Sequence, residues 1–146
     1  MTAARRRVAI AAGVLVFLPI SALVARWLAA DGAERSKVER LLTAQARGDA
    51  AAMARELHRC DAACERRMAT LAGRLGRPGD LEIVRYDSKT ARTLGAKTAP
   101  TRVVWQLPGT LTTVQCVRVR RTGNALTGTT VTLLDLSAPI EREAGC

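Results

Sequence analysis

The chain has 146 residues, enough for one domain with a sizeable core, and a formal net charge of +10. A basic chain can indicate a nucleic-acid partner, but aromatic side chains that stack on bases are scarce. Beyond the first 30 residues only Tyr86 and Trp105 remain. We therefore expect no nucleic-acid ligand.

Residues 1–30 have the composition of a membrane-targeting segment. Three arginines at 5–7 precede an uncharged run from Val8 to Ala25, and Arg26 and Trp27 follow it. At a rise of about 1.5 Å per residue the run nearly spans a hydrocarbon core of about 30 Å. Because no clean small-x-small cleavage site follows, we favour an uncleaved single-pass anchor. The alternative is a cleaved signal peptide and a secreted domain.

The orientation of the anchor follows from its flanks. The arginines at 5–7 favour a cytoplasmic N-terminus, although basic residues also follow the apolar run. All four cysteines lie beyond the run, and an even set of cysteines is typical of an oxidising compartment. We expect residues 31–146 to form one extracytoplasmic domain of a cell-membrane protein.

Apolar residues recur with helical spacing between Asp31 and Leu75. Gly48 and Asp49 predict the end of one helix and the N-cap of the next, and Asp61 predicts the N-cap of a third. Two apolar stripes result: Val38, Leu41 and Leu42 in the first helix, and Cys64, Met68, Leu71, Ala72 and Leu75 in the third.

A period of two replaces the helical period after residue 80, which predicts strands. The expected strands are 81–87, 101–107, 111–121 and 128–136. Turn residues between the last three predict a meander of antiparallel hairpins. We interpret Arg118, Arg120 and Arg121 as a solvated strip, with anionic lipid or an acidic partner as its functional alternative. The fold class is α+β, with about three helices on one face of about four strands.

Two segments within residues 35–136 resemble the NTF2-like (cystatin-like cone) superfamily: VERLLTAQARGDAAAMARELH and RVVWQLPGTLTTVQCVRVRRTGNALTGTTVTLLDL. The chain is most similar to its membrane-anchored members, such as Mce-associated proteins and periplasmic domains of type IV secretion assembly factors. The resemblance implies a curved sheet around N-terminal helices and a binding or scaffold role in the cell envelope. Short loops and few aromatics depart from the longer members.

Cys60 and Cys64 are spaced CxxxC, which has three interpretations. A metal site would combine them with His58 and could add Cys116 or Cys146, but structural zinc sites usually use CxxC spacing. A redox pair would need a thioredoxin-like strand context, which is lacking. We favour two structural disulfides, Cys60–Cys64 and Cys116–Cys146, and no metal or cofactor. The main rival pairing joins Cys60 or Cys64 to the sheet.

Enzyme signatures are thin. The single histidine, His58, accompanies no nucleophile elbow or phosphate-binding loop. Family enzymes work with carboxylates and tyrosine inside the cone, and the resemblance offers Tyr86, Asp87 and Asp135 for that role. The possible pocket residues are Tyr86, Trp105 and Asp135. The simpler interpretation places them in the core or on the surface. A ligand carrier or enzyme is therefore the alternative to a scaffold, and the oligomeric state stays open.

Overall fold

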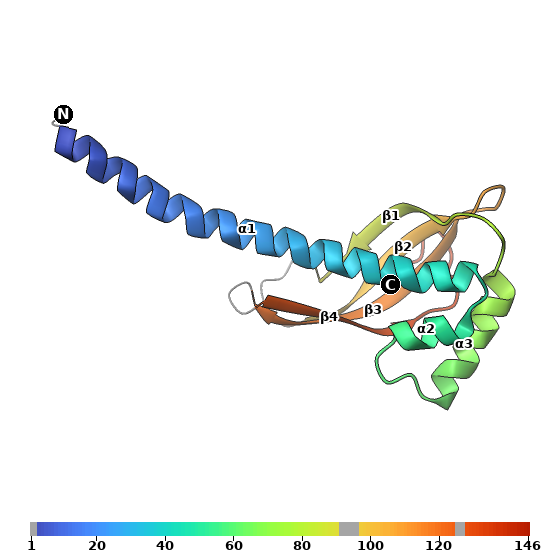
Figure 1. Ribbon diagram of the computed structural model, residues 1–146. Coiled ribbons are helices and arrows are strands. Elements are labelled where there is room, and N and C mark those ends of the chain that lie inside the picture. Colours follow the sequence, from blue (N-terminus) through green and yellow to red (C-terminus); the bar gives the residue numbers. More distant parts are fainter. Residues whose placement is uncertain (1–2, 91–96, 125–127) are drawn as a thin grey trace.

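The computed structural model describes residues 3–90, 97–124 and 128–146 (Figure 1). Three helices come first within these residues: α1 (Ala3–Ala46), α2 (Ala50–Glu56) and α3 (Ala62–Leu75). Four strands follow: β1 (Glu82–Ser88), β2 (Lys97–Gln106), β3 (Thr113–Asn124) and β4 (Gly128–Leu136). The predicted α+β class and the order of helices before strands are confirmed.

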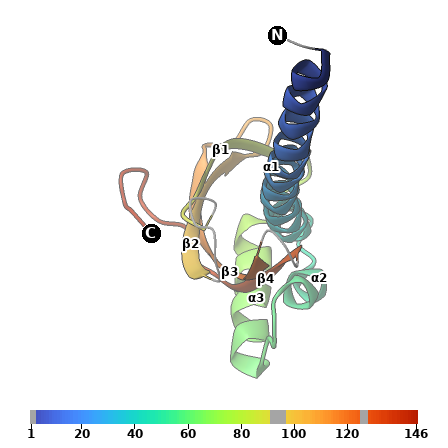
Figure 2. The same ribbon diagram turned by 90° about the vertical axis from the view of Figure 1, so that its left-hand side faces the viewer.

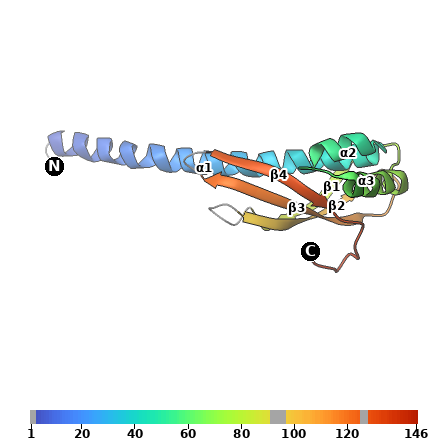
Figure 3. The ribbon, with the colours of Figure 1, turned by 90° about the horizontal axis from the view of Figure 1, so that it is seen from below.

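Helix α1 is one uninterrupted helix of 44 residues. It passes without a break through residues 30 and 31, where we expected the anchor to meet the domain. Its N-terminal half projects away from the sheet and leaves Leu15 74% exposed (Figure 3). This helix is long and apolar enough to cross a membrane, and a signal sequence would have the same character. The side chain of Trp27, which follows the apolar run, lies outside the described side chains.

The sheet is a simple antiparallel meander in the order β1-β2-β3-β4. All three helices cover one of its faces, and the C-terminal segment lies on the other (Figure 2). Alternate residues of β2 and β3, among them Val103, Trp105, Val117 and Val119, are buried under the helices. The chain after α2 contacts the edge of β4 at one position, where the backbone N–H of His58 donates to Leu133 O at 2.8 Å.

The predicted helix boundaries are confirmed at their caps. Gly48 follows α1 with φ +73°, a conformation that glycine adopts at no steric cost. The carboxylate of Asp49 accepts from the N–H of Ala52, and that of Asp61 accepts from the N–H of Cys64, each at 2.8 Å. Short connections therefore fold α2 and α3 back against α1 and fix the helical layer over the sheet.

Candidate functional site

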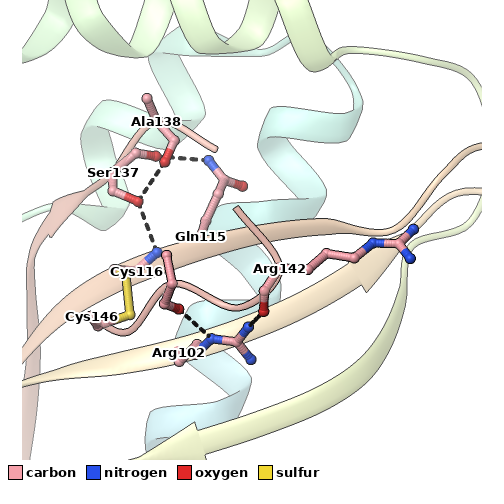
Figure 4. Close-up of a disulfide and its surroundings, with 8 residues drawn as sticks. Arg102, Gln115, Cys116, Ser137, Ala138, Arg142 and Cys146 are labelled. Atoms are coloured by element: carbon pink, nitrogen blue, oxygen red, sulfur yellow. Dashed lines mark hydrogen bonds between the residues drawn. A yellow bond between two sulfur atoms is a disulfide. The ribbon is translucent and has the colours of Figure 1, made fainter. Parts of the chain in front are cut away.

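The structure pairs the cysteines as we favoured, Cys60 with Cys64 and Cys116 with Cys146. The second bridge ties the C-terminal segment to β3 on the helix-free face of the sheet (Figure 4). The Arg102 side chain holds the same segment, because it donates to the carbonyl oxygens of Arg142 and Ala144. Both bridges are therefore positioned to brace the domain.

With all four sulfurs in disulfides, no cysteine thiolate is available as a metal ligand or nucleophile. Among the described residues no three His, Cys, Asp or Glu side chains gather as a candidate metal site. His58, the nitrogen ligand of the metal interpretation, is exposed beside the first bridge. The stretch around Cys60 and Cys64 thus offers a brace at the start of α3.

Each of the three possible pocket residues has a different partner. The indole N–H of Trp105 is buried and donates to Gln115 Oε1 at 2.8 Å. Tyr86 Oη donates to Glu34 at 2.8 Å, and Asp135 pairs with Arg67 at 2.9 Å. The structure therefore does not bring Tyr86, Trp105 and Asp135 together around one space. Asp87, their companion in the enzyme interpretation, pairs with Arg85 on the exposed part of β1.

A fully buried carboxylate, that of Glu34 on α1, is the centre of the densest polar cluster that the described residues form. Its Oε1 accepts from Tyr86 Oη and Thr101 Oγ1, each at 2.8 Å. Its Oε2 accepts from Thr90 Oγ1 at 2.5 Å and from Arg121 Nε at 2.7 Å. Residues from or next to β1, β2 and β3 thus converge on one helix position. We call Asp31, Glu34, Tyr86, Thr90, Thr101 and Arg121 the Glu34 cluster.

Arg121 completes the charge balance of this cluster. Its side chain is 5% exposed, and its Nη2 lies 2.6 Å from Glu34 Oε2 and 2.8 Å from Asp31 Oδ1. Our interpretation of Arg121 as part of a solvated strip is wrong, whereas Arg118 and Arg120 are exposed as expected. Arg121 continues the inward alternation of Gln115, Val117 and Val119, so the strand period already placed it on the buried face.

The environment shifts the pKa values within the Glu34 cluster. Burial alone would raise the pKa of Glu34, but hydrogen bonds from Thr90, Ser88, Thr101 and Tyr86 together hold that pKa below its ordinary value. Burial and the neighbouring Glu34 charge raise the pKa of Tyr86. Glu34 is therefore ionised and Tyr86 is a hydrogen-bond donor at neutral pH. Both states suit a structural lock, because neither group is poised to exchange a proton near pH 7.

Sequence reasoning missed Glu34, although its spacing carried a signal. Glu34 precedes Val38 by four residues and Leu41 by seven, so it lies on the apolar stripe of α1. A carboxylate on a buried stripe needs a cation and several donors. The sequence does not show that Thr90, Thr101 and Arg121 supply them, because they come from distant parts of the chain.

A second buried polar cluster joins α1 to the sheet near the C-terminal end of the helix. The side-chain amides of Gln45 and Gln115 are both buried and bond to each other at 3.1 Å. Gln115 also accepts from Trp105 and donates to the Ser137 carbonyl at 2.9 Å. This Gln115 cluster is neutral, in contrast to the Glu34 cluster.

An open groove of about 630 Å³ lies between α3 and the end of β4. Arg66, Arg67 and Arg74 line it from the helix, and Leu71 and Leu136 supply apolar surface. Its lining carboxylates, Asp61 and Asp135, respectively cap α3 and pair with Arg67. The groove therefore keeps an excess of positive charge beside an apolar floor. We call it the α3 groove.

No protein-family model, curated protein or solved structure matches the chain. A functional assignment therefore depends on the geometry of the described residues alone. It offers a lock between α1 and the sheet, two disulfide braces and one basic groove on the outside.

Proposed function

We propose that this chain is a membrane-anchored, extracytoplasmic module that binds another protein of the cell envelope. The observation that carries the proposal is the continuity of α1. One helix contains both the exposed apolar run and the core residues Val38, Leu41 and Leu42. A continuous helix with no intervening linker couples the position of a membrane anchor directly to the folded domain.

The contacts of α1 with the sheet support a fixed tether. The Glu34 cluster and the Gln115 cluster join the helix to β3 at two positions, eleven residues apart on α1. Two buried attachments on one rigid helix oppose pivoting of the sheet about the anchor. The two disulfides support placement of the domain in an oxidising compartment.

The α3 groove is the proposed binding surface. It lies among the elements farthest from the N-terminus, at the opposite end of the domain from the projecting half of α1 (Figure 1). Its arginines and its leucine floor suit an acidic segment with apolar side chains. We also propose an NTF2-like fold, supported by the helical layer on one face of an antiparallel meander.

In-cell photo-crosslinking tests the binding role. A photoreactive residue at Thr70, in the α3 groove, should give a discrete adduct with one envelope protein. The same residue at Glu39, exposed on α1, is the control position. Charge reversal at Arg66 and Arg74 should reduce the Thr70 adduct severalfold. Adducts of equal yield at both positions would argue against the groove.

The anchor is tested separately. Carbonate extraction of membranes and N-terminal sequencing of the mature protein decide between an anchor and a cleaved signal peptide. Retention in the membrane with an intact N-terminus is the expected result. Release of a chain that begins near residue 30 would establish the secreted alternative. Protease added from outside should degrade the domain and spare the N-terminal segment.

A further inference from the structure

The side-chain hydrogen bonds between α1 and β3 show which end of the sheet lies nearest to the exposed half of α1. Arg121 on β3 bonds to both Asp31 and Glu34 on α1. Farther along, Gln115 on β3 bonds to Gln45 on α1. The residue numbers rise along one element as they fall along the other, so α1 and β3 run side by side in opposite directions (Figure 1).

The sheet continues past Arg121 toward the apolar run. Strand β3 extends three residues farther, to Asn124, which adds about 10 Å at 3.3 Å per residue. On α1, the distance from Asp31 back to Ala25 is about 9 Å at 1.5 Å per residue. The end of β3 therefore reaches the level at which the apolar run ends. Figures 1 and 3 both show β3 and β4 ending beside the middle of α1.

This end of the domain carries exposed positive charge. Lys89 follows β1, Lys97 begins β2 opposite Arg121, and Arg120 lies near the end of β3. All three are exposed, and none has an ion-pair partner among the described residues. The nearby carboxylates of Asp31 and Glu34 are already bound to Arg121. We call Lys89, Lys97 and Arg120 the basic rim.

We propose that the basic rim rests on the membrane surface and binds the headgroups of anionic phospholipids. The proposal rests on the anchor in the proposed function, because the anchor brings this end of the sheet to the bilayer. The interfacial layer of a bilayer adds about 5–7 Å on each side of the hydrocarbon core. By the same rises per residue, Lys97 lies about 10 Å from the core boundary and Arg120 about 13 Å from it. Lys89 also lies about 13 Å away, because its neighbour Thr90 bonds to Glu34. Their long side chains then reach within a Debye length of the headgroups, about 8 Å at physiological salt.

Photo-crosslinking to lipid tests this contact on the full chain. The protein is reconstituted in vesicles of phosphatidylcholine with 30% phosphatidylglycerol, with a trace of either photoreactive phosphatidylglycerol or photoreactive phosphatidylcholine. Mass spectrometry maps the adducts on peptides that contain Lys89, Lys97 or Arg120. We expect a severalfold preference for phosphatidylglycerol at these peptides. At 1 M salt the Debye length falls to about 3 Å, and the preference should fall toward one.

Charge reversal supplies the matched comparison. The triple variant K89E/K97E/R120E should lose the preference, because its rim repels anionic headgroups. All three side chains are exposed, so the fold should tolerate the change. The control R47E/R55E/R77E makes the same charge change on exposed arginines at the far end of the helical layer. It should keep the wild-type preference.

The outcomes separate the two proposals. Carbonate extraction of the same vesicles first shows whether α1 holds the chain in the bilayer. Release from the vesicles overturns the anchor and the basic rim together. Retention with equal crosslinking to both lipids overturns the basic rim alone. A preference that the control variant loses as fully as the rim variant also overturns it, because net charge would then explain the effect.

Discussion

The two ends of the interface between α1 and the sheet are held by different chemistry. At the end near the apolar run, the buried contact is the charged Glu34 cluster, in which Arg121 meets two carboxylates. At the other end, the contact is the neutral Gln115 cluster, next to the disulfide that joins Cys116 to Cys146. The Cys60–Cys64 bridge also lies at that end, at the start of α3.

Because of this difference, different solution conditions should destabilise the two ends of the interface. An ion cluster out of water depends on the charge state of its carboxylates, so acid weakens it. Amides do not titrate, and disulfides respond to reductant instead. The end that we place at the membrane is thus acid-sensitive and the far end is redox-sensitive. Variants at each end, and changes of pH, test that separation.

Replacing Glu34 with alanine should have the largest effect. The change leaves the Arg121 guanidinium buried with only Asp31 beside it, which costs roughly 3–5 kcal/mol of the free energy of unfolding. Urea unfolding of the full chain in detergent micelles measures the loss. Glu39→Ala, an exposed change on the same helix, should stay within about 0.5 kcal/mol. Equal losses in the two variants would contradict a lock at Glu34.

The loss of stability on removing each disulfide should increase with the length of the loop that it closes. The Cys116–Cys146 bridge spans 30 residues and its loss should cost about 3.5 kcal/mol, whereas Cys60–Cys64 spans 4 and should cost about 2 kcal/mol. Serine pairs at each bridge, compared by thermal unfolding, measure the difference. Because neither bridge touches the Glu34 cluster, the acid response should be the same in both variants. The reverse ranking would show that the unfolded chain does not set these energies.

Replacing Gln115 with alanine should cost about 2 kcal/mol, because Trp105 Nε1 and the Gln45 amide lose their partner while buried. The same loss is expected at pH 7 and pH 4, since no group of the Gln115 cluster titrates there. Urea unfolding at the two pH values checks this. A strongly pH-dependent loss would remove the contrast between the two ends.

Mild acidification of the wild type should have the smallest effect on its stability. The folded pKa of Glu34 lies below its ordinary value of 4.5, so the unfolded chain binds more protons than the folded one in this range. The stabilisation is present above pH 4.5 and is lost as pH falls toward the folded pKa. Melting temperatures from pH 7 to pH 3 should show this loss in the wild type.

The variant Glu34→Gln separates this titration from other carboxylates. It removes the group that titrates but keeps an oxygen acceptor, so its melting temperature should depend less on pH. A weaker slope of the same sign should persist, because the backbone N–H of Cys64 lowers the pKa of Asp61. Identical pH profiles for the variant and the wild type would show that Glu34 does not carry the acid response.

Local patterns predicted much of the fold. Asp49 and Asp61 cap α2 and α3 as expected, because a cap depends on neighbours within one turn. Strand β4 has the predicted bounds, while β2 begins four residues earlier, at Lys97, because pairing with β3 extends it. Trp105 is buried, in agreement with the simpler interpretation of it as a core residue. Such features depend on spacing within a single element.

The candidate sites were harder to predict because they depend on distant residues. Asp135 lines the α3 groove together with Arg67, its partner 68 residues earlier, because folding brings α3 beside β4. Tyr86 turned out to be a donor to Glu34, 52 residues away. Neither pairing leaves a trace in local periodicity, since the partners share no element.

Residue spacing and composition predicted the apolar N-terminal run, the α+β class, and the caps and alternation of the individual elements. These follow from composition and from the helical and strand periods. Only long-range packing shows that the apolar run and part of the domain core share one helix, and that Glu34 and Arg121 neutralise each other in the core. The desolvation cost of a buried charge is offset only where folding brings its counter-charge and hydrogen-bond donors within hydrogen-bond distance.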